Sequence, residues 1–143
     1  MLIQDVMTKE AVQCGPDETV AWAAQLMRSR NVGCVVVTDA EAVKGILTDR
    51  DITLRCTAEG RDSHRLVGEC MTAEVVTAGP EEDSLEIADR MASLRLRRMP
   101  IVQHGRLIGL VSLSDIERAL LEPVHSILYL HGATATDDWS MAA

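Results

Sequence analysis

The chain of 143 residues contains no phenylalanine, two tryptophans and one tyrosine, so aromatic residues make up only 2% of it. An apolar core must therefore be built from aliphatic side chains. These are plentiful, because hydrophobic residues make up 47% of the chain. At this length we expect one compact domain, or two half-size units that share a core.

Positive charge is also scarce, since 14 Lys and Arg against 22 Asp and Glu leave a net charge of −8. Nucleic-acid binding needs a strongly positive surface, so this balance argues against nucleic acid as the main partner. The chain has no run of 18 apolar residues, and residues 1–20 lack the basic start and apolar stretch of a signal peptide. We therefore expect a cytoplasmic protein with no membrane partner.

The residues that would build a metal site or a catalytic centre lack the necessary spacing. The four cysteines, Cys14, Cys34, Cys56 and Cys70, form no C-x-x-C pair and are expected to be reduced thiols. The histidines have no metal-ligand spacing among themselves or with cysteine. No Ser-His-Asp or Cys-His arrangement and no glycine-rich P-loop is visible. The sequence therefore predicts no metal site, no catalytic residues and no enzyme.

The main positive feature of the sequence is an internal duplication at an offset of 64 residues. The identical pairs are Leu2/Leu66, Met7/Met71, Thr8/Thr72, Val12/Val76, Gly15/Gly79, Pro16/Pro80, Glu18/Glu82, Ala24/Ala88, Met27/Met91, Gly45/Gly109, Asp51/Asp115 and Ile52/Ile116. This period is too long for a solenoid repeat. It predicts a first unit over 1–60, a second over 61–121 and a C-terminal extension over 122–143, with any ligand held where the units face each other.

Each unit has the pattern strand, helix, strand, strand, helix, which predicts an α/β (α+β) fold in two layers. The expected strands are 11–14, 33–38 and 43–47 in the first unit, and 75–78, 99–103 and 107–111 in the second. The first helix of each unit follows a Gly-Pro break and shows an apolar stripe: Val20, Ala23, Ala24 and Met27, then Leu85, Ala88 and Met91. Of the extension, we expect 122–130 to dock as a helix or strand and 131–143 to be frayed.

The motif that could carry chemistry is Gly45–Asp51, repeated as Gly109–Asp115. It combines a strand end, a hydroxyl at a helix start and a carboxylate three residues later. Backbone N–H groups at a helix start favour an anion such as phosphate, and a carboxylate can accept hydrogen bonds from two ribose hydroxyls. The same spacing also matches an ordinary capping box, which only seals the helix end. Both interpretations remain open at this point.

The repeated Gly-apolar-apolar-Thr/Ser-x-x-Asp pattern is preceded in each unit by Met-Thr, Gly-Pro and Ala-x-x-Met. Together these motifs resemble a tandem pair of cystathionine-β-synthase (CBS) domains, also called a Bateman module, of the small stand-alone prokaryotic type. The resemblance covers residues 1–121. It implies two βαββα units that pack through their sheets about a pseudo-two-fold, in pairs that commonly dimerise.

The resemblance also implies a binding module rather than an enzyme. It needs no cofactor, and its typical ligands are AMP, ADP or ATP, with NAD or S-adenosylmethionine as further candidates. The implied function is a regulatory adenine-nucleotide sensor that acts in trans on an effector protein the sequence does not name. The alternative is a ligand-free scaffold for dimerisation or protein interaction.

The family pattern implies one ligand site per unit, with Thr48 or Ser112 at the phosphate and Asp51 or Asp115 at the ribose. Site one is expected to contain Val12, Gln13, Cys14, Gly33, Cys34, Val35, Thr48, Arg50 and Asp51. Site two is expected to contain Val76, Thr77, Ala78, Arg97, Arg98, Met99, Pro100, Ser112 and Asp115.

The supply of arginine differs between the units. Arg95, Arg97 and Arg98 precede a strand of the second unit, whereas the first unit has Arg50 inside its motif. Arginine suits phosphate because its planar fork donates two hydrogen bonds at once. The alternative is that these arginines only solvate the surface of an acidic protein.

A second difference concerns assembly. Trp22 and Leu26 form an extra apolar stripe on the first helix, where the second unit has the i, i+4 pair Glu86 and Arg90. We therefore expect Trp22 and Leu26 to be interface residues, with Trp22 meeting either a second chain in a homodimer or the segment 127–130.

Overall fold

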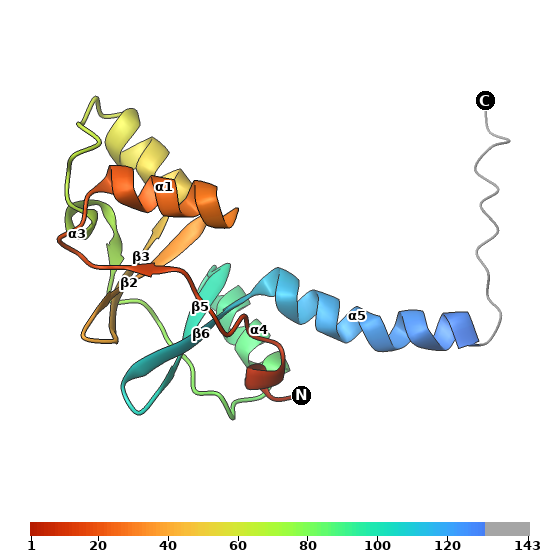
Figure 1. Cartoon of the computed structure of the whole chain (residues 1–143). Helices are drawn as coiled ribbons and strands as arrows, with labels where there is room; N and C mark the ends of the chain where they lie inside the picture. Colours follow the sequence, from red (N-terminus) through yellow and green to blue (C-terminus); the bar gives the residue numbers. More distant parts are fainter. Residues whose placement is uncertain (131–143) are drawn as a thin grey trace, which may run out of the picture.

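The computed structural model describes residues 1–130, and Figure 1 shows two halves with a long C-terminal helix that leaves the second half. In chain order the elements are η1 (Ile3–Asp5), β1 (Gln13–Cys14), α1 (Val20–Arg30), β2 (Cys34–Asp39), β3 (Ala42–Thr48), α2 (Asp49–Asp51), the π-helical η2 (Ile52–Thr57), α3 (Val67–Cys70), β4 (Thr72–Ala73), α4 (Ser84–Ser93), β5 (Arg98–Gln103), β6 (Arg106–Ser112) and α5 (Leu113–Leu130). The mixed fold expected from the sequence is confirmed. No helix within residues 1–130 carries an apolar stretch long enough to cross a bilayer.

The two repeats fold alike because equivalent residues perform the same local tasks. Helix α1 begins where Thr19 Oγ1 accepts the N–H of Trp22 at 3.1 Å, and α4 begins where the Asp83 carboxylate accepts the N–H of Leu85 at 2.9 Å. The hairpins β2–β3 and β5–β6 share one register, which pairs Cys34 with Thr48 and Arg98 with Ser112. The Thr/Ser of each motif therefore lies beside the start of the preceding strand of its own repeat.

The first residues of each repeat, however, pair with the other repeat. Strand β4 comes from the second repeat and lies antiparallel to β3 of the first, which completes the sheet order β1-β2-β3-β4. Its equivalent in the first repeat is Thr8, which exchanges two backbone hydrogen bonds of 2.9 Å with Leu110 of β6. The two repeats thus exchange their N-terminal segments.

Backbone hydrogen bonds and core packing continue this exchange. The Ile3 N–H donates to the Glu82 carbonyl at 2.9 Å, and the Val67 N–H donates to the Glu18 carbonyl at 2.8 Å. Ile3 is fully buried in the core of the second half, and Val67 is fully buried in the core of the first. Each of the two cores therefore includes side chains from both repeats, so the halves fold together.

Two glycines make the exchange sterically possible. A Cβ at Gly45 would lie 2.6 Å from both Met71 Sδ and the Thr72 carbonyl oxygen. A Cβ at Gly109 would lie 2.5 Å from Met7 Sδ and 2.9 Å from the Thr8 carbonyl oxygen. A side chain at either position would overlap the backbone of the other repeat. The glycine of each motif is therefore required by the Met-Thr segment of the other repeat, which packs against it.

The helix faces differ from the sequence expectation in two places, because Ala24 and Leu85 are exposed, Leu85 by 57%. The rest of the α1 stripe is buried as expected, and α4 buries the equivalent positions. These are Val20, Ala23 and Met27 in α1 and Ser84, Ile87 and Met91 in α4. The apolar face of α4 is therefore rotated relative to the one expected from Leu85, Ala88 and Met91.

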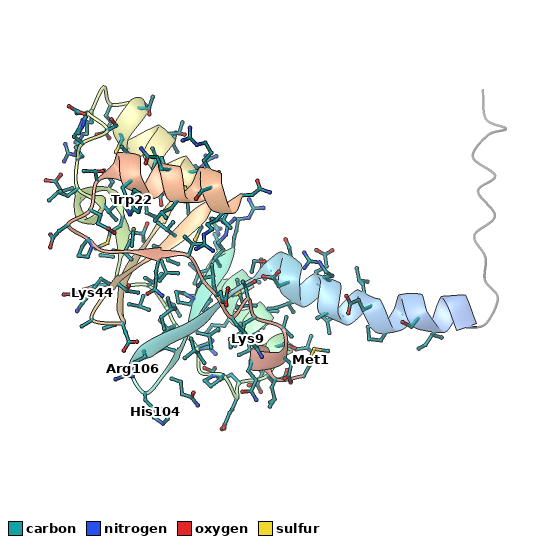
Figure 2. All side chains as sticks on the ribbon, viewed as in Figure 1. Met1, Lys9, Trp22, Lys44, His104 and Arg106 are labelled. Carbon is teal, nitrogen blue, oxygen red and sulfur yellow. The ribbon has the colours of Figure 1, made fainter. Side chains whose placement is uncertain are left out.

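The segment 122–130 is helical, one of the two forms expected, but its position differs from the expected one. It continues α5, which projects from the body and away from α1, so it does not dock on Trp22 within one chain (Figures 1 and 2). Val124 and Ile127 are exposed. Trp22 is 45% exposed, whereas Leu26 packs against the first core. The expectation for residues 131–143 concerns a segment outside the described residues.

Substitution of the matched glycines should destabilise the fold. We expect Gly45→Ala and Gly109→Ala each to lower the free energy of unfolding by about 1–3 kcal/mol, because the new methyl group forces backbone of the other repeat to shift. Urea unfolding followed by circular dichroism measures this. Gly79→Ala is the control, since its Cβ would lie 3.7 Å from its nearest neighbour, Glu82 Oε1. Equal stability of Gly45→Ala and Gly79→Ala would contradict this packing.

Candidate functional site

Two of the larger cavities between the repeats contain the Thr/Ser-x-x-Asp motifs. Cleft A has a volume of about 450 Å³ and is lined by Thr8, Glu10, Ala11, Val12, Asn31, Val32, Gly33, Cys34, Arg98, Leu110, Ser112, Asp115 and Arg118. Cleft B has a volume of about 650 Å³ and is lined by Ile46, Thr48, Asp49, Arg50, Asp51, Thr72, Val75, Arg95, Leu96, Arg97, Arg98, Ser112, Leu113, Ser114 and Glu117. Both volumes fall in the range of roughly 300–1,000 Å³ that is usual for small-molecule sites.

The two clefts are equivalent under the 64-residue repeat. Most residues of cleft A have their counterpart in cleft B: Thr8/Thr72, Ala11/Val75, Asn31/Arg95, Val32/Leu96, Gly33/Arg97, Cys34/Arg98, Leu110/Ile46, Ser112/Thr48 and Asp115/Asp51. Each cleft thus joins the strand start of one repeat to the Thr/Ser-x-x-Asp motif of the other. A ligand that fills either cleft would contact both repeats.

This arrangement divides the expected site one between the clefts. Its wall residues Val12, Gly33 and Cys34 line cleft A, whereas its motif residues Thr48, Arg50 and Asp51 line cleft B. The sequence grouping assumed that one unit supplies a whole site. The structure instead places each motif opposite the strand start of the other repeat.

The expected site two is divided in the same way. Arg97 lines cleft B and Asp115 lines cleft A, while Arg98 and Ser112 line both clefts. Arg50, Arg95, Arg97 and Arg98, which belong to different repeats, all line cleft B. The difference in arginine supply seen in the sequence is therefore concentrated in one cleft.

Eight expected site residues line neither cleft: Gln13, Cys14, Val35, Val76, Thr77, Ala78, Met99 and Pro100. Cys14, Val35, Ala78 and Met99 are core residues instead. For Val35 and Met99 the reason is the alternation of side chains along a strand, because their neighbours Cys34 and Arg98 line the clefts.

Several lining residues were missed because the exchange of segments is not visible in the sequence. The sequence shows Thr8 and Thr72 as repeat partners without a site role, and each lines the cleft beside the other repeat's motif. Ile46 and Leu110 belong to the repeated motif strands and were likewise not assigned. A rule that each Met-Thr packs on the opposite motif glycine would have placed all four.

The two motifs form capping boxes and line the clefts at the same time. In the first, Asp51 Oδ2 accepts the Thr48 N–H at 3.0 Å, and Thr48 Oγ1 accepts the Asp51 N–H at 3.1 Å. In the second, Asp115 Oδ2 accepts the Ser112 N–H at 2.9 Å and the Ser112 hydroxyl at 2.6 Å. The two interpretations left open by the sequence are therefore compatible.

The second oxygen of each carboxylate faces an arginine at longer range. Asp51 Oδ1 lies 3.6 Å from Arg55, and Asp115 Oδ1 lies 3.6 Å from Arg118. Arg55 also donates to the Cys70 carbonyl at 2.9 Å and to Thr72 Oγ1 at 3.2 Å. Since Cys70 and Thr72 belong to the second repeat, Arg55 links the cleft B carboxylate to the exchanged segment.

Cys34 is the thiol that lines cleft A, and it is 5% exposed. Burial raises the pKa of Cys34 to about 11, with the nearby acids Asp51 and Asp49 adding to the rise and Arg98 opposing it. A thiol in this state is a poor nucleophile, because the thiolate is the reactive form. Within residues 1–130, no group of three or more His, Cys, Asp or Glu side chains is placed to hold a metal ion.

Comparison with known proteins gives a consistent result. The family model for the CBS domain matches the chain twice, over residues 3–56 and 67–122. The CBS domain-containing protein YhcV of Bacillus subtilis is 40% identical over 114 residues, which cover 80% of this chain and 81% of that protein.

Two solved structures extend the comparison. Hypoxic Response Protein I with two coordinated zinc ions has a TM-score of 0.75 at 30% identity and covers 82% of this chain and 98% of that one. A relative of that name from Mycobacterium tuberculosis is 32% identical over 127 residues, 87% of each chain. The CBS domain pair of protein MJ0100 was solved in complex with 5′-methylthioadenosine and S-adenosyl-L-methionine. It has a TM-score of 0.76 at 24% identity, and the match covers 84% of this chain and 95% of that one.

The Cys34 thiol should react slowly in the folded chain. A pKa of about 11 lowers its thiolate population at neutral pH by roughly a hundredfold or more relative to an exposed cysteine. We expect iodoacetamide at pH 7.4 to alkylate Cys34 at least about tenfold more slowly than in urea-unfolded protein. Mass spectrometry of the Cys34 peptide measures this, and equal rates in both states would contradict the buried thiol.

Proposed function

The chain belongs to the CBS domain family, and from this membership we propose that it is a regulatory module that binds an adenine-containing ligand in the clefts between its two repeats. AMP, ADP or ATP are the ligands proposed first, and NAD and S-adenosylmethionine are further candidates. The output acts in trans on an effector protein. No catalytic step is assigned to the chain.

The observation that carries the proposal is the cross-repeat composition of both clefts. Asp51 in cleft B and Asp115 in cleft A keep one carboxylate oxygen for the capping box and present the other beside an arginine 3.6 Å away. Vicinal ribose hydroxyls would donate to that second oxygen. Such charge-assisted hydrogen bonds are stronger than neutral ones and hold a nucleoside in one orientation.

Apolar side chains that line each cleft suit the base. Val32 and Leu110 line cleft A, and their repeat partners Leu96 and Ile46 line cleft B. A flat heterocycle gains free energy when it leaves water for such a wall, while the carboxylate fixes the sugar. The MJ0100 domain pair, which was solved with two adenosine compounds, shares the fold at 24% identity and motivates the choice of adenine.

A ligand between the repeats would also provide a signal. It can shift the arrangement of the repeats only if its contacts differ between the alternative arrangements. The exchanged segments carry part of each cleft, because Thr8 lines cleft A and Thr72 lines cleft B. Ligand contacts at these threonines would therefore couple occupancy directly to the packing that joins the repeats.

Titration calorimetry against AMP, ADP, ATP, NAD and S-adenosylmethionine tests the proposal. We expect micromolar binding of at least one adenine compound. Asp51→Ala should weaken ligand binding in cleft B, and Asp115→Ala should weaken it in cleft A. Each loss should be about 1–3 kcal/mol of binding free energy, for one lost charged hydrogen-bond partner. Asp89→Ala is the control, since Asp89 is an exposed acid of α4 that lines neither cleft.

The capping role of the same carboxylates must be separated from binding. Loss of a cap costs about 1 kcal/mol of stability, so each variant is also melted in the absence of ligand. An affinity loss in a variant that stays folded at the titration temperature supports the sites. Binding that is absent for every adenine compound would instead favour the ligand-free scaffold.

We also propose that the chain forms a homodimer through the outer face of α1. Trp22 is a large apolar side chain that is 45% exposed in the single chain, and Figure 2 shows it on α1 in the first half. Isolated exposed apolar residues are common, but tryptophan is one of the residue types enriched among the residues that carry most of the binding energy of an interface. Burial of Trp22 against a second copy would explain why the first repeat has Trp22 and Leu26 where the second has the polar pair Glu86 and Arg90.

Size-exclusion chromatography with light scattering tests the dimer. The wild-type protein should have twice the mass of the 15.6 kDa chain, and Trp22→Glu should shift it to the monomer, because a carboxylate would be buried without a partner. Leu85→Glu places the same charge at an exposed position of the equivalent helix α4 and should leave the dimer intact. A wild-type monomer would overturn this proposal.

A further inference from the structure

Cleft B gathers four arginines in a chain that is acidic overall. Arg95 and Arg97 lie in the loop between α4 and β5, Arg98 is the first residue of β5, and Arg50 lies in α2 on the first repeat's side of the same cleft. Within residues 1–130, none of the four has an acidic side chain within 4.0 Å, whereas Arg55, Arg90, Arg106 and Arg118 all have ion-pair partners. The positive charge of these four is therefore available to a ligand.

The equivalent cleft shows that the fold does not need these arginines. The repeat partners of Arg95, Arg97 and Arg98 are Asn31, Gly33 and Cys34, which line cleft A. Two arginines line cleft A. Arg98 is shared with cleft B, and Arg118 lies 3.6 Å from Asp115. Two clefts of one architecture thus differ mainly in guanidinium supply and in size.

The backbone at Arg95 gives an independent indication. Arg95 has φ +55° and its repeat partner Asn31 has φ +53°, so both adopt the left-handed conformation at the end of a helix. Asparagine tolerates this conformation well, whereas arginine does not. A residue kept in a disfavoured conformation suggests a role for its side chain, and the side chain of Arg95 lines cleft B.

Within residues 1–130, none of the acids that line cleft B forms an ion pair with its four arginines. Asp51 is held by the Thr48 N–H at 3.0 Å and by Arg55 at 3.6 Å, and Asp49 Oδ1 accepts the Arg50 backbone N–H at 2.8 Å. Glu117 also lines the cleft. Asp51 is thus placed for a sugar, while the guanidinium groups of Arg95 and Arg97, on the second repeat, are placed for a group of several negative charges.

We propose that cleft B is a polyphosphate site that selects a nucleoside di- or triphosphate, and that cleft A does not discriminate by phosphate number. The nucleoside part rests on the proposed function, whereas the polyphosphate part depends only on the arginines. A planar guanidinium donates two parallel hydrogen bonds to a phosphate group, and each additional phosphate of a chain reaches a further arginine. Affinity in cleft B should therefore rise with the number of phosphates.

Calorimetry on the full chain tests this with two series of probes. The first is inorganic, from orthophosphate through pyrophosphate to tripolyphosphate, and the second is adenosine, AMP, ADP and ATP. We expect tripolyphosphate and ATP to bind most tightly in their series. Arg95→Asn and Arg97→Gln should each weaken both by at least about tenfold, the loss expected for one charged hydrogen-bond partner, and should leave adenosine unchanged.

Matched controls separate this effect from general charge and from folding. The double variant Arg28→Gln/Arg30→Gln removes two exposed arginines of α1 outside both clefts and should not change tripolyphosphate binding. Arg95→Asn should melt at the wild-type temperature or above, because asparagine adopts the left-handed conformation more readily, whereas a purely structural role for Arg95 would lower the melting temperature.

The outcomes distinguish the two proposals. If adenosine and AMP bind but ATP and tripolyphosphate bind no tighter, the polyphosphate site is overturned and the nucleotide module stands. If tripolyphosphate binds through Arg95 and Arg97 while adenosine adds nothing to its affinity, the polyphosphate site stands with an inorganic ligand and the adenine proposal fails. Tripolyphosphate binding that is absent, or is unchanged in both variants, overturns the polyphosphate site.

Discussion

The packing of each Met-Thr segment against a glycine of the opposite repeat is the constraint on which the rest of the structure depends. Met71 and Thr72 occupy the space above Gly45, and Met7 and Thr8 occupy the space above Gly109. This contact brings the start of one repeat into the core of the other and adds it to the edge of the other's hairpin. A half of the chain on its own would lack part of its core, so the two repeats depend on each other for stability.

The same exchange determines where a ligand can bind. It aligns the Thr/Ser-x-x-Asp motif of one repeat with the strand start of the other, so both clefts are formed by the pair and neither belongs to one repeat. The contacts that hold the fold use the motif glycine, methionine and backbone, whereas the residues at the strand start face the cleft. Positions such as 31 and 95 could therefore diverge, to Asn in one cleft and Arg in the other, without loss of the shared architecture.

Much of the fold could be predicted from the sequence, because repeat identities, helix caps and apolar periodicity are local signals. The strands from Cys34 and Arg98 and the helix after Thr19 follow from such signals. The composition of the clefts could not, because Thr48 and Val12 are assigned to one unit by sequence proximity and are separated only by the long-range exchange. Side-chain alternation had a similar effect, since Val35 and Met99 belong to the core although their neighbours line clefts. A helix over 122–130 was one of two forms expected, but its fusion with the preceding helix into one α5 could not be predicted, because the repeat ends before it.

The central claim is that a ligand is held by both repeats at once. The most direct measurement is a crystal structure of the chain grown with ATP. The account predicts density for the nucleotide in cleft B, with its ribose at Asp51 of the first repeat and its phosphates at Arg95 and Arg97 of the second. Density confined to residues of one repeat, or lying outside both clefts, would contradict it.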